Sequence, residues 1–199
     1  MKQIALLFLI CLGVHVSSFA KTGSFISADR FSNSIITDLC QDKYGNIWIA
    51  TDYGLNKFDG YSFTSYLHES NDDTSLGHNA VVSLLCDREG NLWVGTNRGL
   101  DRYDQNTDNF VHYSFPRNHR PRVSEMIQLA DGTLFVSTSG YGAYVVGDDN
   151  QLHFTSEYSA NSDETYYDIV YEDSKQRFWR CVYHDASVIL RSDGHFSKF

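Results

Sequence analysis

The residues that could carry out chemistry are spread along this sequence and form no recognisable catalytic motif. Zinc hydrolases commonly carry two histidines and a glutamate as HExxH on one helix, and no histidine after residue 20 stands in that pattern or in an i, i+4 pair. Those histidines are at positions 68, 78, 112, 119, 153, 184 and 195. The glycine-rich phosphate loop and the kinase motifs are also missing. We therefore predict no catalytic residue, no metal and no cofactor.

One acidic segment has the opening spacing of a calcium-binding loop. Asp104, Asn106 and Asp108 stand at alternate positions, as the first ligands of such a loop do. However, Asn109 occupies the sixth position, where glycine is required, and Phe115 the twelfth, where glutamate is required. We interpret the segment as a polar hairpin turn.

The composition indicates a globular protein that does not bind nucleic acid. Its 199 residues are 42% hydrophobic and 15% aromatic, which is enough apolar material for one globular domain. The formal net charge of -9 argues against nucleic acid as a partner, because binding phosphates requires a basic face.

The first 20 residues have the pattern of a signal peptide. Lys2 precedes the apolar stretch 4–16, and the small residues Ser18 and Ala20 suit signal peptidase. The apolar stretch is shorter than the roughly 20 residues that span a bilayer. We expect 1–20 to be removed and 21–199 to fold outside the cytoplasm.

Internal repetition is the strongest signal in the chain. Segment 36–66 returns as 82–113, and weaker copies cover about 123–158 and 168–199. Six residues of the first copy recur 45 positions later: Gly45, Trp48, Thr51, Gly54, Leu55 and Asp59. Repeats of this length without helical periodicity are typical of β-propellers. We predict an all-β protein of about four blades, each of four antiparallel strands, forming part of a larger propeller.

The strand after the first turn of each repeat lines up in columns. One column holds Trp48, Trp93, Phe135 and Trp179, and another holds the small residues Ala50, Gly95, Ser137 and Cys181. Apolar residues on both faces of a strand indicate a sheet packed between neighbours. The tryptophans are thus predicted to be core residues, and the small column to mark close approach of the next blade or strand.

The same alignment bears on the cysteines that follow the signal peptide. Cys40 corresponds to Leu85, so Cys86 is displaced by one residue and lies on the opposite face of its strand. A Cys40–Cys86 disulfide therefore looks geometrically awkward. We expect Cys40, Cys86 and Cys181 to be small buried hydrophobic residues.

These motifs resemble the two-component regulator propeller repeat. DREGNLWVGTNRGLDRYD (87–104) matches its pattern nearly throughout, and DKYGNIWIATDYGLNKFD (42–59) matches closely. In that family the repeats form the periplasmic sensor region of hybrid histidine kinases that detect polysaccharide breakdown products. The resemblance implies a periplasmic segment of a sensor whose parent is anchored in the inner membrane, and it leaves room for a homodimer.

Binding is the function that these observations favour. In a propeller, the loops between blades share a face with the turns joining second and third strands, and here both are rich in aromatic and polar residues suited to sugars. The candidate ligand-binding residues are Tyr53, His78, Asn79, Arg98, Arg122, Tyr141, Tyr167 and Tyr183. The expected partner is a carbohydrate-like ligand or neighbouring propeller blades.

Two other classes of function stay open at this point. A propeller lyase or hydrolase acting on polysaccharide would need paired carboxylates in a central cleft, whereas the acidic residues here fall mainly in hairpin turns. A purely structural or interaction propeller would bind no glycan.

Overall fold

The computed structural model describes residues 31–154, 167–175, 177–182, 185–192 and 195–198. Within them the chain forms four antiparallel sheets of four strands, each sheet made from consecutive strands of one repeat. Tyr183 lies outside the described residues. The predicted all-β propeller architecture is confirmed.

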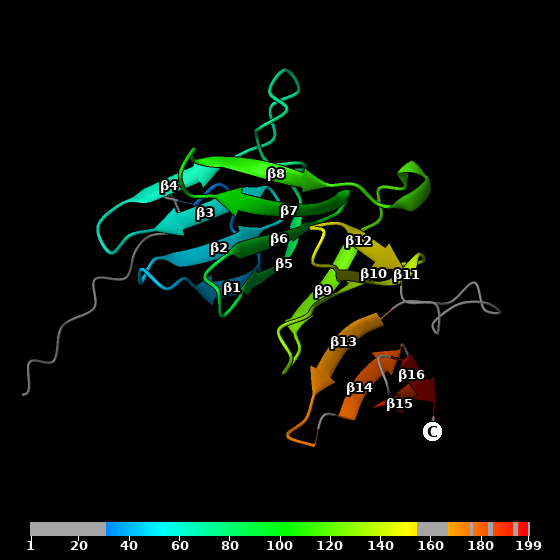
Figure 1. The fold of residues 1–199 in the computed structure, drawn as a ribbon. Coiled ribbons are helices and arrows are strands. Elements are labelled where there is room, and N and C mark those ends of the chain that lie inside the picture. The colour runs from blue at the N-terminus through cyan, green and yellow to red at the C-terminus, as the bar shows by residue number, and fades with distance from the viewer. Residues whose placement is uncertain (1–30, 155–166, 176, 183–184, 193–194, 199) are drawn as a thin grey trace, which may run out of the picture.

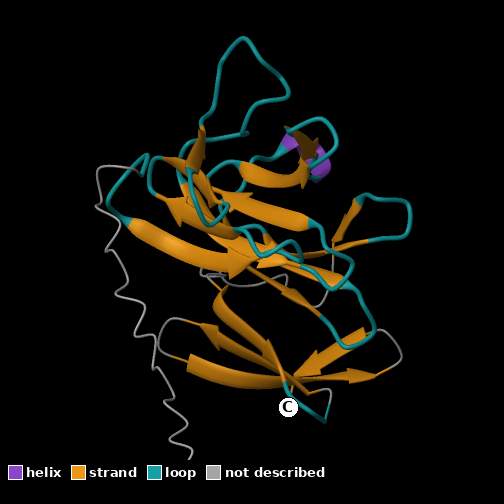
Figure 2. Ribbon diagram, turned by 90° about the vertical axis from the view of Figure 1, so that its left-hand side faces the viewer, coloured by secondary structure: helices purple, strands orange, loops and turns teal. Residues whose placement is uncertain are grey.

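We call the sheets blades 1 to 4. Blade 1 contains β1 (Ile36–Gln41), β2 (Ile47–Thr51), β3 (Gly54–Phe58) and β4 (Phe63–Tyr66). Blade 2 contains β5 (Val81–Cys86), β6 (Leu92–Thr96), β7 (Gly99–Asp104) and β8 (Asn109–Tyr113). Blade 3 contains β9 (Val123–Gln128), β10 (Leu134–Thr138), β11 (Gly142–Val146) and β12 (Leu152–Phe154). Blade 4 contains β13 (Tyr167–Glu172), β14 (Arg177–Val182), β15 (Asp185–Ser192) and β16 (His195–Lys198). A single 3-10 turn, η2 (Pro116–Asn118), is the only helix of the described residues (Figure 2).

The blades follow one another in chain order (Figure 1). The first strand of each blade contacts the first strand of the next, from β1 to β5, β9 and β13. Among the described residues, no helix has the length and apolar character needed to cross a membrane.

Two apolar cores fill the spaces between blades. The first joins Trp48 and Leu55 of blade 1 to Leu84 and Val94 of blade 2. The second repeats this with Trp93 and Leu100 of blade 2 against Met126 and Val136 of blade 3. Trp48 and Trp93 are 1% and 4% exposed, so the predicted burial of both tryptophans is confirmed.

The column of small residues has the predicted cause. A Cβ on Gly95 would lie 2.3 Å from Ser83 Oγ and 2.8 Å from a methyl carbon of Val123, which belongs to the next blade. Glycine is needed here because Ser83 of the paired strand β5 and Val123 of the next blade leave no room for a side chain.

The Asp-x-x-Gly-Asn-x-Trp motif is held together by one carboxylate. Asp42 accepts hydrogen bonds from the backbone N–H groups of Tyr44 and Asn46, and from Trp48 Nε1 at 2.9 Å. Asp87 repeats the bond to Trp93 Nε1 at 2.8 Å. Burial raises the pKa of Asp42, but the hydrogen bonds from Asn46 and Trp48 outweigh it and hold that pKa below its usual value.

Blade 3 replaces both partners of this bond. The column of Asp42 and Asp87 holds Leu129, which is 1% exposed, and the tryptophan column holds Phe135, which has no N–H to satisfy. Blade 3 therefore lacks the carboxylate acceptor in the same repeat that lacks the indole donor.

This pairing gives a first testable prediction. Asp87→Leu should lower the free energy of unfolding by about 2 kcal/mol, since it leaves a buried indole N–H without an acceptor. The same change should cost clearly less in a Trp93→Phe background, which reproduces the pair found in blade 3. Urea titrations of both single variants and the double variant measure the coupling, and strictly additive costs would contradict it.

The end of each inner strand also ties its blade to the preceding one. Gln128 Oε1 accepts the backbone N–H of Arg88 at 2.9 Å, and Glu172, at the same repeat position in blade 4, accepts that of Ala130 at 2.6 Å. Cys86 holds this position in blade 2 and forms a disulfide with Cys40 of blade 1, with Cα atoms 6.2 Å apart.

The expectation that Cys40 and Cys86 are unpaired was therefore wrong. Their placement on opposite faces of equivalent strands is what allows the bond. Successive blades pack with opposite faces in contact, so a side chain on one face of blade 1 meets a side chain on the other face of blade 2. Their Cα separation lies within the ordinary range for disulfides.

One face of blade 1 has no neighbour among the described residues. Ile36 and Leu39 are 49% and 56% exposed, whereas their counterparts Val81 and Leu84 in blade 2 are 1% and 7% exposed. Ile36 and Leu39 are large apolar residues, like the residues that a neighbouring blade covers in blade 2. This face therefore has the character of a surface that receives a further blade.

Candidate functional site

The predicted site residues lie on the face where strands two and three of each blade are joined. Antiparallel pairing brings the loop before each blade to this same face. Three backbone hydrogen bonds show this: Gly54 N–H to Asn79 O at 2.6 Å, Asn97 N–H to Ala80 O at 3.0 Å, and Ser139 N–H to Arg122 O at 2.9 Å. The turns and the loops thus form one continuous rim.

A threonine at the end of each second strand fixes these turns. Thr51 Oγ1 donates to Gly54 O at 2.8 Å and accepts the N–H of Tyr53 at 3.2 Å. Thr96 makes the same pair of bonds with Gly99 O and the N–H of Arg98, at 3.0 and 3.1 Å. Because the backbone is held in this way, the side chains of Tyr53 and Arg98 project from equivalent positions.

The rim turn of blade 3 is one residue longer. Thr138 Oγ1 donates to Gly142 O at 2.6 Å, four residues on instead of three. Tyr141 lies in this turn, is 45% exposed, and its ring centroid lies 4.6 Å from that of His119. The extra residue explains why the glycine of this repeat comes one position late.

Several predicted residues hold the rim together. Asn79 Oδ1 accepts the N–H of His68 at 2.7 Å, and Arg122 donates to Asn97 Oδ1 at 2.7 Å. His78 Nδ1 accepts the N–H of Ala80 at 3.0 Å, and burial lowers the pKa of His78. Tyr53 is 52% exposed on the turn of blade 1. Tyr167 begins β13, and at this position the structure describes the backbone only.

A cleft of about 530 Å³ opens on this rim beside blade 2. It lies between the loop of residues 67–80, which we call the 67–80 loop, and the segment 114–120 that follows β8. Its charged lining comprises His68, Glu69, Asp72, Asp73, Arg98, Asp101, His112, His119 and Arg120. Of the predicted residues, only Arg98 lines it.

Two arginines of the cleft have no partner. The side chains of Arg98 and Arg120 are exposed and make no hydrogen bond or ion pair with the described residues. Arg88 and Arg122 are engaged, by contrast: Arg88 bonds to Gln128, and Arg122 bonds to Asn97. Arg98 and Arg120 therefore offer guanidinium groups whose donors are available to a ligand.

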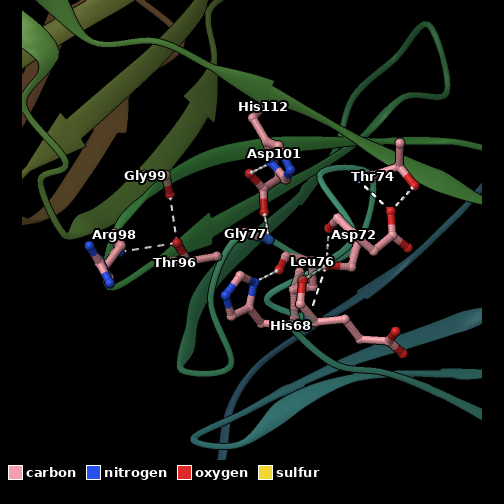
Figure 3. A network of polar contacts seen from close by, with 12 residues as sticks. His68, Asp72, Thr74, Leu76, Gly77, Thr96, Arg98, Gly99, Asp101 and His112 are labelled. Atoms are coloured by element: carbon pink, nitrogen blue, oxygen red, sulfur yellow. Dashed lines mark hydrogen bonds and ion pairs between the residues drawn. The ribbon is translucent and has the colours of Figure 1, made fainter.

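A buried carboxylate lies at the wall of the cleft (Figure 3). Asp101, 3% exposed, accepts the N–H of Gly77 at 2.8 Å and lies 2.7 Å from His112 Nδ1. The hydrogen bond to Asp101 raises the pKa of His112, although burial acts in the opposite direction. The pair connects strands β7 and β8 to the 67–80 loop.

Sequence reasoning missed His68, Asp101, His112, His119 and Arg120 as cleft residues. A signal for Asp101 was present, since Asn56 and Asp101 are polar residues at one repeat position, each directly after the leucine of its third strand. The others lie on loops or an outer strand that have no repeat pattern to align.

No cluster of three metal-ligating side chains occurs in the part of the chain that the structure describes. Asp104, Asn106 and Asp108 belong to the β7–β8 hairpin, where Asp108 accepts the Tyr66 hydroxyl at 2.8 Å. The interpretation of this segment as a hairpin turn is confirmed.

Comparison with known proteins identifies the repeats. Residues 30–53 and 75–98 match the family described as Two component regulator propeller. Two segments of the chain, one leading into each of the first two blades, are thus similar to this repeat family. The matched segments contain β1 and β2 of blade 1 and β5 and β6 of blade 2, including both disulfide-bonded cysteines.

A curated relative extends the comparison. The chain is 45% identical over 53 residues to Histidine kinase P4 of Formosa agariphila. The alignment covers 27% of this chain and 4% of the kinase.

Solved structures share the fold. The extracellular domain of a hybrid two component system from B. thetaiotaomicron superposes with a TM-score of 0.73 at 22% identity, covering 88% of this chain and 26% of that one. Virginiamycin B lyase from Staphylococcus aureus gives 0.64 at 14% identity, covering 85% of this chain and 57% of the lyase. The chain thus spans about a quarter of the length of that extracellular domain.

Proposed function

We propose that this regulator propeller is part of the periplasmic, ligand-sensing region of a two-component system, and that its rim binds a carbohydrate-like ligand without transforming it. The parent protein is anchored in the inner membrane. The family match and the fold shared with an extracellular domain of such a system support the sensor role.

The cleft beside blade 2 is the observation that carries the ligand proposal. Its volume of about 530 Å³ lies in the range of small-molecule sites. Exposed guanidinium and carboxylate groups at its mouth, Arg98, Arg120 and Glu69 among them, can each bond to two neighbouring hydroxyls of a sugar ring. The ligand therefore contacts Arg98 and Arg120 together with the 67–80 loop.

Calorimetry of the full chain against a panel of oligosaccharides tests this function. Arg98→Ala should weaken binding of a panel ligand by roughly tenfold or more, the loss expected for a hydrogen bond to a charged group. The melting temperature should stay unchanged, because the guanidinium of Arg98 has no partner among the residues that the structure describes.

Tyr53→Ala is the matched control, because Tyr53 occupies the same turn position in blade 1 and does not line the cleft. It should leave the affinity unchanged. Binding that is insensitive to Arg98→Ala would move the site elsewhere on the rim, and a panel without any binder would contradict the carbohydrate proposal. Chromatography of the incubated sugars checks for turnover, and shortened or unsaturated products would favour an enzyme.

A further inference from the structure

Each of the first two blades holds the chain segment that enters it with one polar side chain on its third strand. In blade 1 this side chain is Asn56, which is fully buried. Its Oδ1 accepts the N–H of Ser32 at 3.0 Å and the hydroxyl of Ser65, its pairing partner on β4, at 2.7 Å. This clamp contains no group that titrates near neutral pH.

Blade 2 builds the same clamp from ionisable residues. Asp101 replaces Asn56, Gly77 replaces Ser32, and His112, the pairing partner of Asp101 on β8, replaces Ser65. A Cβ on Gly77 would lie 2.8 Å from both carboxylate oxygens, so the close approach of the carboxylate requires glycine. Blade 1 therefore serves as an internal comparison for blade 2.

The segment clamped in blade 2 is the end of the 67–80 loop, which projects away from the sheets (Figure 1). Elsewhere this loop is held to the blade by the hydrogen bond from Phe110 N–H to Thr74 O at 2.8 Å. Within the loop, His68 Nδ1 lies 2.8 Å from Leu76 O. Release of Gly77 would thus free the part of the loop nearest the cleft.

The charges around His112 come from two elements. Asp101 of β7 is hydrogen-bonded to it, and Asp73 of the 67–80 loop acts on it through its backbone and its charge. Both raise the pKa of His112. The other acidic and basic side chains that line the same cleft are His68, Glu69, Asp72, Arg98, His119 and Arg120.

We propose that Asp101 and His112 form a proton-dependent latch, which holds the 67–80 loop against blade 2 when His112 is protonated and loosens it when His112 loses its proton. The latch would regulate the ligand cleft, and to that extent it rests on the proposed function. A charged imidazole strengthens the bond to Asp101 and can donate a second bond toward Asp73.

The direction of the effect follows from the raised pKa. A group whose pKa is higher in the folded state contributes its full stabilisation below its ordinary pKa and loses it as pH rises through the folded value. The loop should therefore be held most firmly in mildly acidic conditions and loosen toward alkaline pH.

Hydrogen exchange of the full chain tests the latch without any ligand. Protection of residues 68–80, referred to the unfolded chain at each pH, should fall roughly fivefold between about pH 5.5 and about pH 8, the cost of losing the hydrogen bond that only the protonated ring can donate toward Asp73. Protection of residues 32–35, held by the neutral clamp of blade 1, should stay constant.

The variant D101N/H112S gives blade 2 the clamp residues of blade 1. It should abolish the pH dependence at 68–80, and a fall equal to that of the wild type would overturn the latch. Should this variant unfold, the wild-type amide resonance of Gly77 decides the question. It should titrate with the same midpoint as the His112 ring, and an amide that ignores this titration would overturn the proposal. Neither measurement involves a glycan, so a failed latch and a failed carbohydrate site are distinguishable.

Discussion

Replacing Trp93 with alanine is expected to lower the free energy of unfolding by about 3 to 5 kcal/mol, the usual cost of emptying a large aromatic site. Trp93 lies in the core between blades 2 and 3, with its ring centroid 5.0 Å from that of Tyr113 and the guanidinium carbon of Arg102 5.8 Å above it. The alanine leaves a cavity that both blades line. Urea titration followed by circular dichroism measures the change.

Tyr61→Ala is the control for this prediction. Tyr61 is 92% exposed in the β3–β4 turn, and its removal should change the stability by less than about 0.5 kcal/mol. A loss below about 1 kcal/mol for Trp93→Ala would contradict the central role of this side chain in the core.

Removal of the disulfide is expected to cost about 4 kcal/mol. Cys40 and Cys86 are 46 positions apart, and closing a loop of that size restricts the unfolded chain by about this amount in the chain-entropy description. Cys40→Ala, Cys86→Ala and the double variant should all lose the same stability, because each one removes the whole bond.

A reducing agent provides the complementary measurement. It should lower the urea midpoint of the wild type and leave that of the double cysteine variant unchanged. Equal wild-type midpoints with and without reductant would contradict a stabilising bond between the blades.

The repeat pattern predicted the blades because every interblade contact recurs. Trp48 and Trp93 align with each other, and Gly95 aligns with Ala50, so one alignment revealed both the core and the points of close approach. In a propeller the same packing between blades recurs in every repeat, so the period of the sequence reveals the residues that form it.

The disulfide was missed because the alignment compared equivalent positions, whereas adjacent blades meet through non-equivalent ones. Cys40 and Cys86 differ by one residue in register, which turns each toward the other blade. A strand-by-strand alignment cannot show this unless the direction of stacking is included.

The cleft was predicted only in part for a different reason. The turn carrying Arg98 is fixed by Thr96 and Gly99, which belong to the repeat motif. The 67–80 loop and segment 114–120 are set instead by individual hydrogen bonds, such as that from Phe110 N–H to Thr74 O. These hydrogen bonds do not recur from repeat to repeat, so a repeat alignment cannot predict them.

The covalent joint between blades 1 and 2 has a mechanical consequence. When the chain is pulled from its two ends, tension bypasses the segment between Cys40 and Cys86 through the sulfur atoms. Roughly 150 Å of contour length is thereby withheld from extension. The ties at Gln128 and Glu172 are hydrogen bonds, so strands of blades 3 and 4 can be pulled apart while the segment between Cys40 and Cys86 stays closed.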